Sequence, residues 1–251
     1  MSPTWATELL APTLGDVLAF GMWVASYPAV AEVKRTGNLG TLNPLPWAGI
    51  VLNCSGWLLY SYVVGGQTGN FMFFANAPGL LLGSDYVLTA VRVMPAGPDR
   101  RRVIRCFLAS IAAWTLVAWL AFLTPYGVRN ARTVVGVSAC LGLCVFYAAP
   151  LSSLAAVVRA KDASSISGPL AAVSCLNGCC WTVYGYAIGD PFLFYPNACG
   201  AVLTTVQLLL RASFPAPADV GGALDKPFLG AADQDEGGAR PGSEPEPEGW
   251  A

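Results

Sequence analysis

The sequence contains no histidine and few charged residues. Only 12% of its 251 residues are charged and 55% are hydrophobic, whereas soluble domains have about 25% charged residues. No Lys or Arg falls within five long stretches, at 17–31, 44–91, 106–128, 133–158 and 168–210. Apolar stretches of about 20 residues span a bilayer as helices. The scarcity and placement of charge therefore exclude an ordinary soluble domain.

Several kinds of site are missing as well. Histidine is the most common metal ligand and a frequent general base, and the core shows neither an acidic pair nor a nucleophile beside a base. The eight cysteines fall in predicted helices without a CxxC pair, so we interpret them as packing residues rather than ligands. No basic face suits nucleic acid. We predict a protein that is not an enzyme and binds no metal or cofactor.

Seven membrane-spanning helices are predicted, giving an all-α membrane protein. We place them at 14–33, 44–64, 70–92, 103–123, 133–158, 168–188 and 191–211. Because basic residues concentrate in cytoplasmic loops, their distribution predicts an outside N-terminus and a cytoplasmic C-terminus. The loops on the inner side hold ten bases and those on the outer side only Arg129 and Arg132; the ten are Lys34, Arg35, Arg92, Arg100, Arg101, Arg102, Arg105, Arg159, Lys161 and Arg211.

The two ends of the chain differ from the apolar middle. Residues 1–13 are expected to form an extracellular N-terminus, and we predict no cleavable signal peptide because no positive region precedes the first apolar run. Residues 213–251 contain eight acids and two bases among many Pro and Gly residues. Such a composition cannot bury a core, so we predict a disordered acidic cytoplasmic tail.

An internal repeat divides the middle of the chain. The segment VLNCSGWLLY, which begins at Val51, matches CLNGCCWTVYG, which begins at Cys175. The positions shared by the two copies are Asn53 and Asn177, Trp57 and Trp181, Tyr60 and Tyr184, Asn76 and Asn197, and Gly79 and Gly200. Internal symmetry of this kind is a mark of transporters, whose sites lie near mid-membrane at the repeat interface.

The bases fix how the two repeats are joined. Each copy has basic residues after its first helix, namely Lys34/Arg35 and Arg159/Lys161, so both copies face the same way. Two adjacent three-helix units would insert in opposite directions, so parallel repeats require a helix between them. We predict a 3+1+3 arrangement with a first three-helix repeat at 14–92, a cytoplasmic loop and linker helix at 93–123, and a second repeat at 124–212.

Across residues 14 to 212, the sequence resembles the SWEET (MtN3/saliva) family of sugar facilitators. The resemblance rests on the ordered, duplicated set: AAPLSSLAAVVRAKDASSIS, LNGCCWTVYG and DPFLFYPNACG in the second repeat, and VLNCSGWLLY and FANAPG in the first. It implies bidirectional, uncoupled diffusion of a small sugar through a central pocket that opens alternately to each side of the membrane.

Four side chains are predicted to bind the substrate. Asn76 and Asn197 occupy equivalent places, and a side-chain amide can both donate to and accept from a sugar hydroxyl. Trp57 and Trp181 offer aromatic faces that pack on the apolar faces of sugar rings. The alternatives are interhelical hydrogen bonding for the asparagines and ordinary packing for the tryptophans. Two indoles at one cavity leave little room, which favours a monosaccharide.

The resemblance assigns further roles. It implies that Pro28, Pro46, Pro150 and Pro169 act as hinges, since proline removes a backbone hydrogen bond and kinks a helix; Pro169 lies closer to Trp181 than the family pattern suggests. Tyr60 and Asp190 match residues that close an extracellular gate. Tyr184 fits either such a gate or an ordinary interfacial tyrosine.

Other classes are weighed against a passive sugar uniporter. A related PQ-loop exporter of amino acids or cations would show a Pro-Gln dipeptide, which is absent. A retinal protein would need a lysine in span 191–211, which has none. A seven-helix cargo receptor stays open. Asp85 is the one acid expected at depth, and we interpret it as structurally paired rather than proton-coupling.

The expected partners are a small sugar and the lipid bilayer, with no nucleic acid. We predict a multi-pass protein of the plasma membrane, with an organelle membrane as the alternative. Small residues on several helices permit a homo-oligomer.

Overall fold

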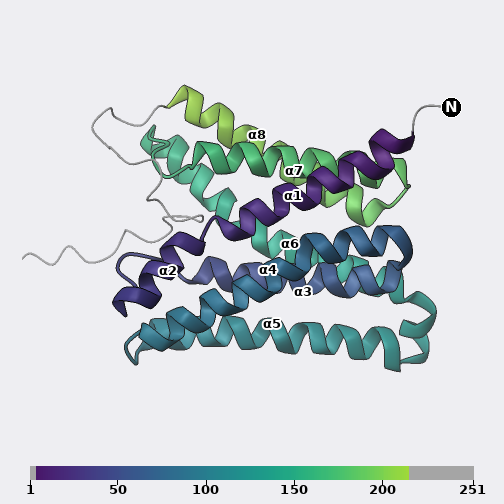
Figure 1. Cartoon of the computed structure of the whole chain (residues 1–251), viewed down its shortest axis with the longest axis horizontal. Helices are drawn as coiled ribbons and strands as arrows, with labels where there is room; N and C mark the ends of the chain where they lie inside the picture. Colours follow the sequence, from purple (N-terminus) through teal and green to yellow (C-terminus); the bar gives the residue numbers. More distant parts are fainter. Residues whose placement is uncertain (1–3, 215–251) are drawn as a thin grey trace, which may run out of the picture.

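The apolar runs of the sequence form long helices that lie side by side (Figure 1). The computed structural model describes residues 4–214, apart from the side chains at positions 146, 148–150 and 152–153. Among these residues there are helices and connecting turns but no β-strand. The helices are the π-helix η1 (Ala6–Leu10), α1 (Ala11–Val24), α2 (Tyr27–Thr36), α3 (Leu45–Val64), α4 (Gly66–Val93), α5 (Pro98–Leu123), α6 (Pro125–Ala160), α7 (Gly168–Ala187) and α8 (Pro191–Ser213).

The helices follow the predicted 3+1+3 order. Helices α1 to α4 form the first repeat, since α1 and α2 together make one interrupted span; α5 is the linker, and α6, α7 and α8 form the second repeat. The repeats interlock because α1 packs on α7 as well as on α4, and α3 packs on α6 as well as on α4 and α5. In Figure 1, α5 accordingly lies along one edge of the bundle, and α7 and α8 lie along the other.

Six helices are long and apolar enough to cross a membrane, judged among the described residues by length and composition. They are Ala6–Thr36, Leu45–Val64, Gly66–Val93, Pro98–Leu123, Pro125–Val145 and Pro191–Ser213. Helix α7 is not among them, although it has 20 residues. It packs against both α1 and α8, so neighbouring helices cover much of its surface.

The first span differs from the predicted 14–33. Helical structure already covers residues 4–13, which we had expected to precede the span, and it breaks at a turn over Ala25 and Ser26 before α2 begins. Pro28 lies in the first turn of α2, where its missing N–H removes no helical bond. The proline thus allows a new helix to start here, and the sequence pattern alone had not shown the break.

Three other helices are longer than predicted. Helix α4 starts at Gly66 rather than 70, α5 at Pro98 rather than 103, and α6 extends from Pro125 to Ala160 rather than over 133–158. Helix α6 includes one residue with non-helical torsions, Asn130, with φ −126° and ψ 22°. Hydropathy misses these ends because they are polar yet still hydrogen-bonded as helix. The predicted tail lies outside the described residues, except for Ser213 and Phe214.

Two glycines allow helices of the second repeat to approach closely. A Cβ at Gly185 would lie 2.7 Å from the backbone nitrogen of Phe194, and one at Gly136 would lie 2.6 Å from the Phe192 ring. These contacts seat α8 against α6 and α7. They hold the start of α8, which carries Asp190, in a fixed place.

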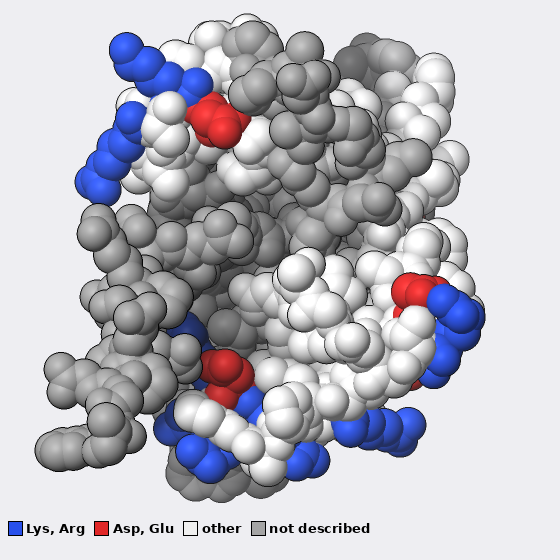
Figure 2. Space-filling view, turned by 90° about the vertical axis from the view of Figure 1, so that its left-hand side faces the viewer, with Lys and Arg blue, Asp and Glu red and all other residues white. Residues whose placement is uncertain are grey.

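The two ends of the bundle are distinguished below by one residue each. The Asp190 end is where α3, α5 and α7 finish and α4, α6 and α8 begin; the Arg101 end is the opposite one. Most described bases lie at the Arg101 end, which is the left side of Figure 1. Figure 2 views this end and shows Lys and Arg gathered around its edge.

Candidate functional site

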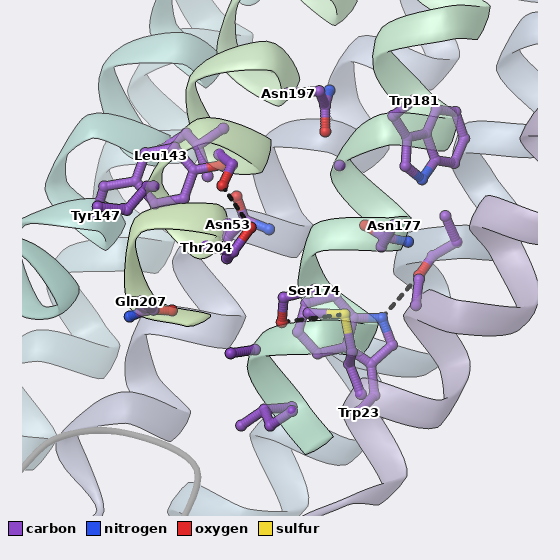
Figure 3. Close-up of a pocket in the computed structure, with 18 of the residues that line it drawn as sticks. Trp23, Asn53, Leu143, Tyr147, Ser174, Asn177, Trp181, Asn197, Thr204 and Gln207 are labelled. Atoms are coloured by element: carbon purple, nitrogen blue, oxygen red, sulfur yellow. Dashed lines mark hydrogen bonds between the residues drawn. The ribbon is translucent and has the colours of Figure 1, made fainter. Parts of the chain in front are cut away.

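A cavity of about 200 Å³ lies between the two repeats. Helices α1, α3, α4, α6, α7 and α8 all contribute to its lining. The structure brings the four predicted substrate residues together here, because Trp57, Asn76, Trp181 and Asn197 all line this cavity. Figure 3 shows Trp181 and Asn197 near one another in the wall formed by the second repeat.

The two asparagines are held in the same way. Asn76 Nδ2 donates to the carbonyl oxygen of Met72 at 2.9 Å, and Asn197 Nδ2 donates to that of Leu193 at 2.8 Å. Each bond spans one turn of the residue's own helix and fixes the amide plane. An amide has two N–H donors and an acceptor oxygen, so each residue retains hydrogen-bonding capacity for a ligand. The predicted alternative, an amide bonded to a neighbouring helix, is not what the structure shows.

The two tryptophans form the end of the cavity nearest Asp190. Each is 6% exposed, and each packs edge-on against the tyrosine three residues later: Trp57 on Tyr60 and Trp181 on Tyr184, both at 6.0 Å between ring centroids. The indole N–H of Trp57 donates to Asn53 Oδ1 at 3.1 Å. Trp181 lies against Gly15 of α1, where a Cβ would come within 2.8 Å of its indole nitrogen.

The cavity also contains residues that sequence reasoning did not assign to a site. Asn53 and Asn177 line it, and their duplication in the two repeats was a signal that could have found them. Asn177 Nδ2 donates to the Gly15 carbonyl of α1 at 2.8 Å, which ties α7 to the first repeat. Trp23 also lines the cavity and donates to the Ala75 carbonyl of α4 at 2.8 Å; no repeat signal marks it.

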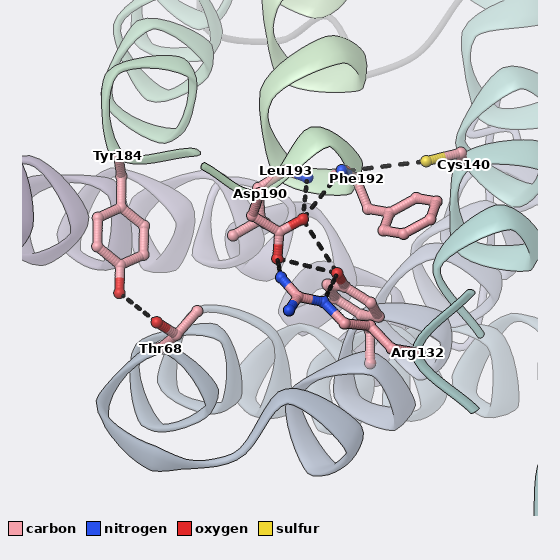
Figure 4. Close-up of polar contacts among 8 residues, drawn as sticks. Thr68, Arg132, Cys140, Tyr184, Asp190, Phe192 and Leu193 are labelled. Carbon is pink, nitrogen blue, oxygen red and sulfur yellow. Dashed lines mark hydrogen bonds and ion pairs between the residues drawn. The ribbon is translucent and has the colours of Figure 1, made fainter. Parts of the chain in front are cut away.

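Beyond the two indoles, a polar cluster closes the Asp190 end. We call Tyr60, Arg132 and Asp190 the Asp190 cluster. The Tyr60 hydroxyl donates to the Asp190 carboxylate, at 2.9 and 3.0 Å from its two oxygens, and Arg132 Nη2 lies 2.9 Å from Asp190 Oδ2. Tyr60 is fully buried and Asp190 is 1% exposed. These contacts join α3, α6 and the start of α8, and Figure 4 shows Arg132 beside Asp190.

Asp190 has a second role as the N-cap of α8. Its Oδ1 accepts from the backbone N–H groups of Phe192 and Leu193, at 2.9 and 3.3 Å, and such a cap satisfies donors that a helix leaves unpaired. Arg132 was counted in the sequence only as a loop base. The structure moves it into α6, and the longer helix explains why it was missed.

Tyr184, the repeat partner of Tyr60, makes a different contact. Its hydroxyl lies 2.8 Å from the Thr68 hydroxyl of α4. Tyr184 is 2% exposed, so its ring is covered by protein, and its role as a gate or interfacial residue stays a prediction. The structure therefore places all three predicted gate residues in polar contacts that cross between the repeats, buried for Tyr60 and Asp190 and partly buried for Tyr184.

The four predicted hinge prolines occupy different positions. Pro28, Pro46 and Pro169 each lie in the first turn of a helix, namely α2, α3 and α7. Pro150 lies inside α6, and its side chain is outside the described residues. First-turn prolines mark helix starts, so three of the four lie at joints between elements. Movement at these joints stays a prediction.

The acids within the spans are placed differently from our expectation. Asp85 pairs with Lys34 at 2.6 Å, with both side chains nearly half exposed, as its structural interpretation predicted. Asp16, which we had not counted as deep, is half-buried in α1, and its Oδ1 is the one buried side-chain oxygen or nitrogen among the described residues without a hydrogen-bond partner. The spans of the first repeat therefore contain four acids, Glu8, Asp16, Glu32 and Asp85.

Comparison with known proteins places this geometry in a family. Residues 133–218 match the MtN3_slv family, described as a sugar efflux transporter for intercellular exchange. This chain is 22% identical over 201 residues to the bidirectional sugar transporter SWEET5 of Arabidopsis thaliana, covering 80% of this chain and 83% of that one. It is 25% identical over 195 residues to the sugar transporter SWEET1 of Dictyostelium discoideum, covering 77% and 87%. The chain is thus similar to SWEET transporters over about four fifths of its length.

The SWEET fold is also evident in the coordinates. A solved eukaryotic SWEET transporter superimposes with a TM-score of 0.72 at 21% identity, covering 82% of this chain and 95% of the other. The family match falls on the second repeat, where the sequence pattern was also most specific. These matches confirm the resemblance drawn from the duplicated motifs, and the superposition confirms the seven-helix fold.

Proposed function

We propose that this chain is a bidirectional, uncoupled uniporter of a monosaccharide, which works by alternating access around the central cavity. The observation that supports the proposal best is the pairing of site residues. Each repeat donates one asparagine and one tryptophan to a single cavity, and the Asp190 cluster closes that cavity at one end. The named activities of the SWEET relatives support sugar as the substrate.

Sugar recognition would use the hydrogen-bonding capacity that the asparagines retain. A pyranose has hydroxyls around its edge and C–H groups on its faces. In the proposal, Asn76 and Asn197 bind the hydroxyls, while the indoles of Trp57 and Trp181 pack against a C–H face. Because hydroxyls lose water on entering the cavity, each must find a protein partner there. The two amides can supply such partners with little further loss of conformational entropy, because hydrogen bonds to their own helices already fix their orientation.

The size of the cavity supports a small substrate. Pockets for drug-sized ligands measure about 300–1,000 Å³, and the cavity here is about 200 Å³. Toward Asp190 the wall is formed by two indoles backed by two tyrosines, so the central site cannot extend to a second ring on that side.

Replacing Trp57 with alanine should relax this size limit. The substitution removes a buried indole from the cavity wall, and we expect the ratio of sucrose to glucose uptake to rise about tenfold or more. The measurement is uptake of both labelled sugars by proteoliposomes. Trp119→Ala is the matched control, because Trp119 lies on α5, is 51% exposed and does not line the cavity. An unchanged preference in Trp57→Ala would contradict the size argument.

Alternating access would proceed from the state that the structure describes. The cavity lining extends from Leu193, near the Asp190 end, to Ser165 and Ser167 at the Arg101 end. Tyr60 and Asp190 are buried, whereas Ser165 and Ser167 are partly exposed. We infer that the cavity is open toward the Arg101 end. Opening the other way would break the Asp190 cluster and move the repeats about Pro28, Pro46, Pro150 and Pro169.

The basic residues support an orientation. We propose that the Arg101 end is cytoplasmic, because loops rich in Lys and Arg stay on that side, and that the described state is therefore inward-open. The N-terminus would be outside and the acidic tail inside. We propose the plasma membrane as the location, with the 14–92 and 124–212 repeats as the moving halves around the 93–123 linker.

Transport by the purified protein tests the function directly. Proteoliposomes holding the chain should equilibrate labelled glucose down its gradient from either side, faster than empty liposomes. Imposing a pH gradient should leave the final distribution unchanged. Concentrative uptake driven by a proton gradient would overturn the uncoupled mechanism and would direct attention to Asp16. Absence of uptake for a panel of hexoses would overturn the sugar assignment.

A further inference from the structure

The cavity continues past the central site toward the Arg101 end, and this part of its lining comes from the second repeat. Ser174 of α7 and Thr204 and Gln207 of α8 form its polar wall; we call these three residues the Gln207 subsite. In Figure 3, Ser174 and Gln207 both lie in the lower part of the view, below Trp181 and Asn197. Ser165 and Ser167, which precede α7, line the same region.

The equivalent region of the first repeat is closed. At the repeat spacing, Ser174, Thr204 and Gln207 correspond to Ile50, Gly83 and Tyr86. Ile50 and Tyr86 are each 1% exposed. A Cβ at Gly83 would come within 3.0 Å of the Ile50 side chain, so α3 and α4 are in tight contact here.

Tyr86 is bonded into this closed packing. Its hydroxyl donates to the Trp23 carbonyl at 3.1 Å, and its ring lies 5.8 Å from that of Trp47. At this depth in the helix bundle, the two repeats therefore differ in polarity and in packing. One is packed with an aliphatic residue and two aromatic rings, whereas the other is polar and borders open space.

The polar groups of the Gln207 subsite have unused hydrogen-bonding capacity. Gln207 is half-buried, and its amide has no hydrogen bond to any residue in 4–214 that the structure records. Thr204 donates to the Gly200 and Ala201 carbonyls, which leaves its oxygen able to accept. The Ser174 hydroxyl has only a 3.9 Å contact with the Met22 sulfur. A half-buried amide without a partner is costly unless water or a ligand supplies one.

We propose that the Gln207 subsite is a second monosaccharide-binding position at the open Arg101 end of the cavity, where a bound sugar extends outside the enclosed space of about 200 Å³ that holds the central sugar. The proposal rests on the sugar-transport function proposed above and adds a distinct site to it. An amide and two hydroxyls match a pyranose edge, as the asparagines do in the central site. Because the first repeat has no such groups here, the sugar passes along α7 and α8 alone. The twofold pairing of residues in the central site therefore does not extend to the Gln207 subsite.

Equilibrium binding distinguishes two sites from one. The full chain in lipid nanodiscs, titrated calorimetrically with D-glucose, should bind two molecules per chain. Gln207→Leu keeps the size of the side chain but removes the amide, and it should bind one. Thr204→Val, which replaces a hydroxyl by a methyl group, should weaken the second site at least fivefold and serves if Gln207→Leu does not fold. Gln67→Leu, on an exposed part of α4 outside the cavity, should still bind two.

The double variant Asn76→Ala/Asn197→Ala completes the test, because it should lose the central site and retain the weaker one. One molecule per chain in the unmodified protein, or two in Gln207→Leu, would overturn the proposal while leaving transport through the central site intact. If glucose neither binds nor crosses proteoliposomes, the proposed function itself fails, and the two failures are thereby distinguishable.

Discussion

Replacing either cavity asparagine with alanine should reduce glucose transport to near background. Asn76 and Asn197 each have an amide fixed by one bond to their own helix, and the remaining donor and acceptor face the cavity that both residues line. Losing two sugar bonds at about 1 kcal/mol each removes about 2 kcal/mol, a factor of roughly 30. Because the loss falls in a water-poor site, the unpaired sugar hydroxyls add to the penalty.

The experiment compares initial rates of labelled glucose uptake in proteoliposomes with equal protein content. Asn70→Ala is the matched control, because Asn70 is an exposed residue of the same helix α4 and does not line the cavity. It should transport like the unmodified protein. Near-normal uptake by Asn197→Ala would remove that residue from the site, and near-normal uptake by both variants would remove the pair.

Replacing Asp190 with alanine should have the next largest effect, because one carboxylate serves three partners. The substitution removes the N-cap of α8, the acceptor for the buried Tyr60 hydroxyl and the partner of Arg132. The cap contributes about 1 kcal/mol, and an unpaired buried hydroxyl costs about 1–3 kcal/mol. The Arg132 side chain is 54% exposed, so its ion pair adds little.

These losses fall mainly on the state closed at the Asp190 end. A loss of about 2 kcal/mol shifts the balance between the two access states roughly 30-fold, and turnover needs both states. We expect Asp190→Ala to transport at least tenfold more slowly and to unfold at a temperature several degrees lower. The measurements are glucose exchange in proteoliposomes and thermal unfolding of the purified chain.

The Asp190→Asn variant distinguishes the effect of losing the α8 N-cap from the effect of losing the negative charge. Asparagine retains an oxygen that can cap α8 and accept from Tyr60, but it loses the ionic contact with Arg132. Its unfolding temperature should lie near that of the unmodified protein, with transport between the two extremes. If Asp190→Ala exchanges glucose at the normal rate, the cluster does not control access.

The agreement between prediction and structure is uneven along the chain, for physical reasons. Apolar length and the absence of charge place spans well, since only backbone-satisfied helices cross lipid. Helix ends are harder to predict from hydropathy, because they extend beyond the apolar layer of the membrane while their backbones remain hydrogen-bonded as helix. Hence the 133–158 span was predicted without the polar first turns of α6. Arg132 was interpreted as a loop base for the same reason.

The sequence by itself determined the helical class, the 3+1+3 order and the residues that would share a cavity. The placement of charged residues locates the spans. The duplicated motifs show which residues occupy equivalent positions in the two repeats, so Asn76 could be paired with Asn197, and Trp57 with Trp181, from the sequence alone. Only the tertiary structure decided what each member of a pair contacts. Tyr60 meets Asp190 and Arg132, but Tyr184 meets Thr68.

The tertiary structure also decided where the symmetry ends. Gln207 borders open space while its equivalent Tyr86 is sealed against Trp47. A repeat fixes where residues lie within their own three helices, but equivalent helices have different neighbours in the two halves: α5 contacts α3 of the first repeat and α6 of the second, and α1 packs on α7. Contacts between halves depend on that packing, which no local pattern contains.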